Sequence, residues 1–369
     1  KLLLELRIEY GQIKIIPLEI MHLINLKVMN LSNNKIEIIP PEIKYLTNIT
    51  ELVLSCNNIT VIPPEINGLI NLMALNLSYN KIEIIPSEIQ YLTELYELNL
   101  KHNKIIIIPD EIKYLTNIIT LSLSENLITT ITSNIQYLKG ITKIDLCCNK
   151  LSDNEISLLF QNINCFNSNE YNDKLILFMS QLNMTQVPIY IKNMSMLTIL
   201  SMPFNNIVTI PVEIQYLTNL ELLDLHNNKI ISIPPQIEYL SNLKYIRMGY
   251  NNISEIPTTI RYLNNLEILE LNNNQLITLP NELFLVKALR ELYLNNNKIT
   301  YLNKNINLLK KLNKLFLINN RLTSLPSTIL HLDSLNCGFD KILNIPLKIK
   351  EYIDSRSIIY STPDWEDYY

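Results

Sequence analysis

The feature that most constrains the fold of this chain is a unit of 23 residues that recurs along it. Aligned from one leucine to the next, the unit reads L-x-x-L-x-x-L-x-L-x-x-N-x-I-x-x-I-P-x-E-I-x-x, as between residues 46 and 68. Its asparagine falls in one register twelve times, at Asn34, Asn57, Asn80, Asn103, Asn126, Asn149, Asn205, Asn228, Asn251, Asn274, Asn297 and Asn320. Gly11, Leu182 and Asp340 hold the same position in degenerate copies, so we count about fifteen units. An array of this length can fold as one continuous solenoid.

The first half of the unit predicts a short strand. In L-x-L the two leucines point to one side and the intervening residue to the other, so successive strands form a parallel sheet with one buried face. After each strand the chain turns away from the sheet, and its backbone groups lose their ladder partners. An asparagine amide offers two donors and an acceptor to such groups. The asparagine column is therefore predicted to be a structural ladder.

The second half, Ile-Pro-x-Glu-Ile, predicts a single helical or 3₁₀ turn on the convex side. Proline can begin a helical turn because it needs no donor there, and glutamate suits the positive end of the turn. A tyrosine precedes the leucine that ends this turn in seven copies: Tyr45, Tyr91, Tyr114, Tyr137, Tyr216, Tyr239 and Tyr262. We expect these rings to stack on neighbours at the convex edge rather than to bind a ligand.

The unit resembles the leucine-rich repeat family. It is similar to the 23-residue intracellular class, whose I-P-x-E-I half is found in Ras-scaffold proteins and in repeat proteins of amoebae and giant DNA viruses. The resemblance implies an α/β solenoid, a curved horseshoe with a parallel β-sheet on its concave face and short helical or 3₁₀ turns on its convex face. It implies little about function, because this family binds many unrelated partners.

The spacing breaks once, between Asn149 and Leu182, where 33 residues replace 23. Ser152 is a suitable N-cap, and apolar residues follow at helical spacing, which predicts an α-helix over about 153–165. We therefore divide the chain into a first repeat block at 1–151, an insertion at 152–176, a second block at 177–346 and a C-terminal cap with an acidic aromatic tail at 347–369. The insertion is either a tolerated irregularity or a specialised docking element.

Both ends of the array are expected to need a cover, since a solenoid exposes its core at its ends. The segment PLKIKEYIDSRSIIY is the expected C-terminal cap, and the tail STPDWEDYY is expected to be an irregular cap or a short linear motif. At the other end Leu2, Leu3 and Leu4 have no cap before them, so we expect further sequence upstream.

Composition excludes several classes of partner and suggests a compartment. A net charge of −4 and a pI near 5.7 provide no basic field for nucleic acid. Each repeat interrupts its apolar run, so no segment reaches the roughly 20 apolar residues of a membrane span. The five cysteines are odd in number and lack paired clusters, which favours a reducing, cytoplasmic location. The N-x-S/T sequons are expected by chance in a chain so rich in asparagine.

The sequence offers no catalytic motif and implies no cofactor or metal. Asp224, His226, Arg247 and Glu270 should form a row on three adjacent strands, but a flat exposed row lacks the enclosure that tunes pKa values. The adjacent Cys147 and Cys148 are interpreted as surface thiols, because neighbouring cysteines rarely form a disulfide and no basic residue lies near them. We therefore expect a protein that is not an enzyme.

The positions that the leucines leave free should face the concave surface. In the first block they are mostly small or polar, whereas in the second block they become apolar and aromatic. These residues should lie along a strip of roughly 35 Å, since strands stand about 4.8 Å apart. Exposed groups of this kind mark interaction surfaces. The predicted partner-binding residues are Phe178, Ile199, Phe204, Leu222, Tyr245, Arg247, Tyr250, Ile268, Tyr293, Phe316 and Ile318, with Ile176 beside them.

Three functions fit these observations. The leading one is a non-enzymatic scaffold that binds a protein or peptide on the concave side of the second block. In the second, the array is the recognition arm of a larger enzyme or ubiquitin-ligase adaptor whose working domain lies upstream. The third is a structural component, for example of a virus particle, that binds through its convex face or edges. The oligomeric state and the partner's identity do not follow from the sequence.

Overall fold

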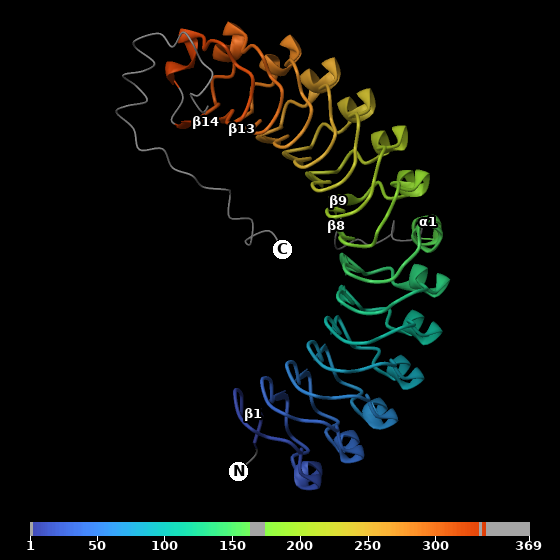
Figure 1. Ribbon diagram of the computed structural model, residues 1–369. Helices are drawn as coiled ribbons and strands as arrows, with labels where there is room; N and C mark the ends of the chain where they lie inside the picture. Colours follow the sequence, from blue (N-terminus) through green and yellow to red (C-terminus); the bar gives the residue numbers. More distant parts are fainter. Residues whose placement is uncertain (1–2, 163–173, 332–333, 337–369) are drawn as a thin grey trace. The chain divides into compact units, whose positions relative to one another are not determined.

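The computed structural model describes residues 3–162, 174–331 and 334–336 (Figure 1). The chain divides into two compact units, Lys1–Asn206 and Ile207–Tyr369. Each is a stack of repeats in which one strand and one turn alternate. Within each unit the strands lie along the concave side of an arc and the turns along its convex side (Figure 1).

In the first unit every strand pairs in parallel with the next strand along the chain. From β1 to β7 the register joins each residue to the one 23 positions later, for example Leu52 to Leu75. Between β7 and β8, across the insertion, the offset is 33, as from Ile144 to Leu177. The strands are β1 Glu5–Arg7, β2 Val28–Asn30, β3 Glu51–Val53, β4 Ala74–Asn76, β5 Glu97–Asn99, β6 Thr120–Ser122, β7 Lys143–Asp145, β8 Leu175–Phe178 and β9 Leu197–Ser201.

The convex side of the first unit carries 3₁₀ turns and one α-helix. The turns are η1 Leu18–His22, η2 Pro41–Tyr45, η3 Pro64–Gly68, η4 Ser87–Tyr91, η5 Asp110–Tyr114, η6 Ser133–Tyr137 and η8 Ile189–Asn193. The helix α1, Asp153–Asn162, packs against η6 and η8 and so occupies the place of a turn. A proline with extended backbone precedes most turns, as the Ile-Pro-x-Glu-Ile pattern predicts.

The second unit repeats this plan. Its strands are β10 Leu222–Asp224, β11 Tyr245–Arg247, β12 Ile268–Glu270, β13 Glu291–Tyr293, β14 Lys314–Phe316 and β15 Ser334–Asn336, again parallel and in sequence order. Its turns are η9 Val212–Tyr216, η10 Pro235–Tyr239, η11 Thr258–Tyr262, η12 Asn281–Leu285, η13 Lys304–Leu308 and η14 Ser327–His331. The predicted parallel sheet and short convex turns are therefore confirmed.

The core between sheet and turns is built from the repeating aliphatic columns. In a typical repeat Leu52, Leu54 and Ile59 are completely buried, and Ile66 buries the turn against them. Burying one such side chain stabilises the fold by about 1.5–3 kcal/mol before chain entropy is counted. Because each column is filled in nearly every repeat, the core runs without interruption through each unit.

The asparagine column forms a hydrogen-bonded ladder beneath the sheet. Asn57 is representative: its amide nitrogen donates to the carbonyls of Leu31 and Leu54 at 3.0 and 3.1 Å. Its amide oxygen accepts from the N–H of Ile36 at 2.9 Å. One side chain thus satisfies backbone groups of two consecutive repeats. The other members make equivalent bonds, and all except Asn320 are buried.

A second column, which the sequence did not predict, immediately precedes each ladder asparagine. These residues have left-handed backbone, for example Glu125 and Tyr250 with φ of 55° and 56°. Asparagine tolerates this conformation better than most residues. Asn227, Asn273, Asn296 and Asn319 hold the position in the second unit, whereas tyrosine, histidine, glutamate or cysteine hold it in several repeats of the first.

The insertion contains the predicted helix. Ser152 caps it, with its hydroxyl accepting from the N–H of Glu155 at 3.2 Å, and Ile156, Leu159 and Phe160 are buried. The helix is described as far as Asn162, and the rest of the predicted span lies outside the described residues. Strand β8 begins at Leu175, so the predicted start of the second block at 177 falls inside a strand. The cap and tail at 347–369 lie outside the described residues.

Candidate binding surfaces

The strands of the second unit present their first and third residues to the concave side. In β11, Ile246 is completely buried in the core, which places Tyr245 and Arg247 on the opposite face. Register then aligns Arg247 with Asp224 on β10 and with Glu270 on β12. The same third position holds Tyr293 on β13 and Phe316 on β14.

The row of polar groups predicted from the sequence is present. The Arg247 guanidinium donates to Asp224 Oδ2 at 3.1 Å and to Glu270 Oε2 at 3.2 Å. His226 Nδ1 lies 2.6 Å from Asp224 Oδ1. Asp224 is 0% exposed and Arg247 is buried, so this is an enclosed ion-pair row rather than an exposed one. Its charged groups are held in place by hydrogen bonds to one another.

The aromatic part of the row is stacked. The rings of Tyr293 and Phe316 lie 4.7 Å apart with an interplanar angle of 5°. The Tyr293 hydroxyl donates to Glu291 Oε2 at 2.5 Å, and Glu291 also pairs with Lys314 at 2.8 Å. Burial, together with the hydrogen bond and the charge of Glu291, raises the pKa of Tyr293 well above the ordinary tyrosine value. The phenol is therefore held in its neutral form.

The expectation of a fully exposed strip is wrong for five of its members. Neighbouring strands are so close that large side chains on them cover one another: Lys143 lies over the Phe178 ring at 5.0 Å, and Tyr293 covers Phe316. The buried members are Phe178, Leu222, Arg247, Tyr293 and Phe316. Ile199, Tyr245, Ile268 and Ile318 are half-buried, while Phe204 and Tyr250 are 50% and 53% exposed. Whether these residues bind a partner stays a prediction.

Ion pairs border the row in the second unit. Glu221 pairs with Lys244 at 2.8 Å, and Glu267 pairs with Arg290 at 3.4 Å, in each case between consecutive repeats. These pairs are partly exposed, so each contributes at most about 1 kcal/mol to stability. They pair charges of opposite sign along this side of the second unit.

The concave edge of the first unit carries a smaller polar cluster. Glu125 pairs with Lys101 at 3.1 Å and with His102 at 2.7 Å, and His102 stacks on Tyr79 at 4.7 Å. The hydrogen bond with His102 lowers the pKa of Glu125, burial opposes this effect, and Lys101 lowers the pKa further. Burial would lower the pKa of Lys101, but Glu125 and Tyr79 together raise it. The cluster is open to solvent and encloses no reaction space.

The adjacent cysteines are not ordinary surface thiols. The N–H of Ser180 donates to Cys147 Sγ at 3.2 Å, and burial, followed by the charge of Asp145, raises the pKa of Cys147 to about 12. Burial and Glu125 also raise the pKa of Cys148. Both thiols are therefore poor nucleophiles. Among the described residues there is also no group of three or more His, Cys, Asp or Glu residues placed to hold a metal ion.

The convex tyrosines do not stack as expected. Within the described residues, none of the seven rings lies against another ring, and all are about half exposed. These rings lie on turns of the convex side, which lack the close spacing of hydrogen-bonded strands. The rings are therefore not brought together as the concave side chains are. Three rings instead contact a cation on the preceding residue: Lys44 over Tyr45, Lys113 over Tyr114 and Arg261 over Tyr262.

The sequence interpretation missed an aliphatic column. Ile15, Ile38, Val61, Ile84 and Ile107 precede the buried isoleucine of Ile-Pro and are between 60% and 75% exposed. The repeat unit leaves this position variable, so the sequence interpretation gave the column no role. Comparing both isoleucines of I-I-P with the strict period would have shown that only one can face the core. No helix in the described part of the chain is long and apolar enough to cross a membrane.

Comparison with known proteins agrees with this architecture. Models of the leucine rich repeat match residues 47–105 and 218–276, and a model of two such copies matches residues 24–64. A leucine-rich repeat protein of Leptospira interrogans is 32% identical, with a TM-score of 0.86 over 97% of this chain and 90% of that one. The chain therefore belongs to the leucine-rich repeat family. It matches no curated protein sequence.

Other solved structures share the fold at lower identity. An internalin of Listeria monocytogenes is 24% identical, with a TM-score of 0.67 over 93% of this chain and 86% of that one. The ectodomain of the Arabidopsis receptor kinase HAESA, solved with a peptide hormone ligand, is 26% identical with a TM-score of 0.60. The match covers 90% of this chain and 57% of that one. Proteins of this fold commonly mediate protein–protein interaction.

Proposed function

We propose that this protein is a non-enzymatic interaction scaffold that binds a protein or peptide on the concave side of its second unit. The observation that carries the proposal is the row from Asp224 to Phe316, in which planar charged and aromatic groups occupy a position that the repeat leaves free. The frame needs none of these residue types, since small polar groups fill the equivalent positions of the first unit, such as Asn76 and Ser122.

The row from Asp224 to Phe316 forms the rigid base of the proposed binding site, and more exposed side chains lie beside it. Tyr245 is half-buried next to Arg247, and Tyr250 is largely exposed on the loop that follows the strand. A rigid base with a few protruding tyrosines suits recognition, because pre-ordered side chains lose little entropy on binding. The HAESA ectodomain, solved with a peptide hormone ligand, supports a peptide or protein as the class of partner.

The test compares two variants of the second unit, each with two tyrosines replaced. The concave variant carries Tyr245→Ser and Tyr250→Asn, and the convex control carries Tyr216→Ser and Tyr239→Ser. Each interface tyrosine removed is expected to cost about 2 kcal/mol, so the concave variant should bind about 10³-fold more weakly. Affinity capture from the source cell, followed by calorimetry with the captured protein, measures the difference.

Capture that survives in the concave variant but is lost in the convex control would contradict the proposal. That outcome would favour the structural-component hypothesis, in which partners attach to the convex side. The variants leave Tyr293 and Phe316 in place because their removal would damage the stack and confuse loss of binding with loss of folding.

We also propose a reducing, intracellular location. The three described cysteines, Cys56, Cys147 and Cys148, are all free thiols. A secreted protein of this fold would be expected to use such residues in disulfides.

A further inference from the structure

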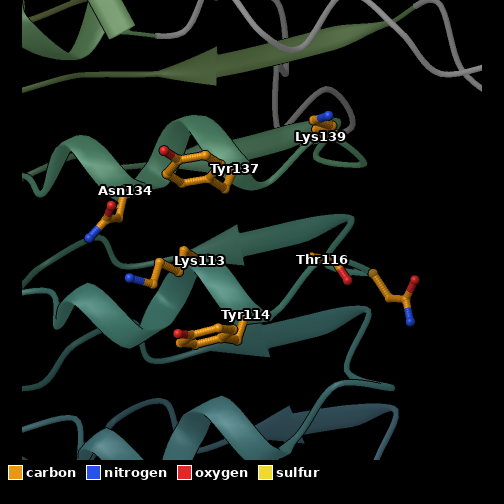
Figure 2. A pocket seen from close by; sticks show the side chains of 7 residues that line it. Lys113, Tyr114, Thr116, Asn134, Tyr137 and Lys139 are labelled. Carbon is orange, nitrogen blue, oxygen red and sulfur yellow. The ribbon is translucent and has the colours of Figure 1, made fainter.

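A groove of about 600 Å³ lies between the turns η5 and η6 on the convex side of the first unit. Tyr114 ends the first turn and Tyr137 the second; both line the groove, and Figure 2 shows their rings on these neighbouring turns. Thr116 and Lys139 lie toward its other end (Figure 2). The groove is open to solvent on one side, and none of its lining residues is acidic.

One end of the groove collects groups that can donate hydrogen bonds. The Lys113 ammonium, the Tyr114 and Tyr137 hydroxyls and the Asn134 amide point to the same side in Figure 2. Lys113 Nζ lies over the Tyr114 ring at 5.2 Å, and no described carboxylate pairs with it. Neither hydroxyl nor the Asn134 side chain is bonded to another described residue. The nearby Asp110 is already engaged by the Thr132 hydroxyl at 2.5 Å.

The groove is distinct because two columns change their chemistry at this repeat. Asn134 stands where the preceding repeats carry glutamate, at Glu42, Glu65, Glu88 and Glu111. Lys139 stands where those repeats carry a neutral residue, at Thr47, Ile70, Thr93 and Thr116. At this repeat the chain thus loses an acidic residue and gains a basic one. The turn η6 is still capped, because the Thr132 side chain accepts from the Asn134 N–H.

The surface between the turns η4 and η5, one repeat earlier, shows what the frame alone provides. It also lies between two tyrosines, Tyr91 and Tyr114, but Gln90 replaces the lysine and Glu94 and Glu111 flank it. An acidic ligand would be repelled there. Of these two places, the η5–η6 groove therefore combines two neighbouring tyrosines with a lysine and has no glutamate in its lining.

We propose that this groove binds an acidic, extended peptide segment of a partner protein. Glutamate or aspartate side chains along the segment would accept from the Lys113 ammonium, the two phenols and the Asn134 amide, in charge-assisted hydrogen bonds. The tyrosine rings provide apolar contact for the peptide backbone, and Lys139 adds positive charge at the other end. An open groove suits an extended chain better than a small molecule, which needs a site that encloses most of its surface.

The experiment measures binding of a fluorescein-labelled peptide of alternating glutamate and glycine by fluorescence anisotropy. The same peptide with glutamine in place of glutamate is the neutral probe. The wild type should bind the acidic peptide, and Lys113→Gln and Asn134→Glu should each weaken binding at least tenfold. Asn134→Glu is compatible with folding because glutamate holds this position in four preceding repeats.

The matched control is Lys44→Gln. Lys44 Nζ lies over the Tyr45 ring at 5.4 Å, as Lys113 does over Tyr114, but the following repeat places Glu65 and Gly68 beside it. This variant should bind like the wild type. Equal loss in the two lysine variants, equal binding of the neutral peptide, or absence of binding would each overturn the proposal. Full displacement of the peptide by an equal concentration of inorganic phosphate would assign the groove to free phosphate instead.

Discussion

The ladder asparagine Asn251 provides a direct test of how the repeats are held together. It is buried, its amide oxygen accepts from the N–H of Ile230 at 2.9 Å, and its amide nitrogen donates to Leu225 O at 3.0 Å and Met248 O at 3.2 Å. Asn251→Ala removes these bonds, together with one to Gly249 O at 3.2 Å, and leaves buried backbone groups of two repeats without this partner. Each unsatisfied group costs about 1–3 kcal/mol. Partial relaxation and water entry reduce the sum, so we expect a total loss of about 1–3 kcal/mol.

The control for this change is Asn242→Ala. Asn242 also donates its amide to a carbonyl of the preceding repeat, to Thr218 O at 2.9 Å, but it is exposed. Water can replace that bond, so the free energy of unfolding should fall by less than about 0.5 kcal/mol. Urea unfolding followed by circular dichroism gives both values. Equal shifts of the two midpoints would refute the argument that burial makes the ladder costly to break. The same reasoning applies to Asn228→Ala, for which a loss of about 1–3 kcal/mol is expected.

Three further outcomes follow from the buried groups. Arg247→Met should lower the free energy of unfolding by about 3–5 kcal/mol, because Asp224 keeps its buried charge without the guanidinium. Adding Asp224→Asn should recover part of this loss. Urea unfolding of the two single variants and the double variant measures the coupling, and strictly additive losses would contradict the ion-pair role. The raised pKa of Tyr293 means that its neutral form stabilises the fold fully below the ordinary tyrosine pKa of about 10, and this contribution is lost as the pH rises further. Alkaline spectrophotometric titration should show one late phenol that disappears in Tyr293→Phe. All five thiols should react with Ellman's reagent after unfolding without reductant, whereas Cys147 should react slowly in the folded protein; a disulfide would argue against an intracellular location.

The repeating core and ladder could be predicted from the sequence because the residues that build them recur in the same register in nearly every repeat. One asparagine in a register is weak evidence, but the column from Asn34 to Asn320 leaves few alternatives, and the L-x-L strands and Ile-Pro turns follow at fixed distances from it. The helix in the insertion was predictable for another reason. Its cap at Ser152 and its apolar spacing are local signals that depend on no other repeat.

The surfaces could not be predicted to the same degree, because exposure depends on neighbours across the stack. Tyr293 and Phe316 alternate away from the core as expected, yet each covers the other. The convex tyrosines form an equally regular column, but wider separation leaves their rings exposed. Sequence periodicity gives the direction of a side chain and says little about how much of it its neighbours cover.

Departures from a column are more informative about function than the column itself, and Tyr250 allows this idea to be tested. Its backbone has φ of 56°, in a position that asparagine holds at Asn227, Asn273 and Asn296. Tyrosine is less tolerant of the left-handed region than asparagine, a penalty of about 1 kcal/mol. Tyr250→Asn should therefore raise the free energy of unfolding by about 0.5–1 kcal/mol while it weakens partner binding. Thermal unfolding and calorimetry measure the two effects on the same sample. A variant that is both less stable and fully able to bind would show that the ring supports the fold, and it would remove Tyr250 from the proposed binding surface.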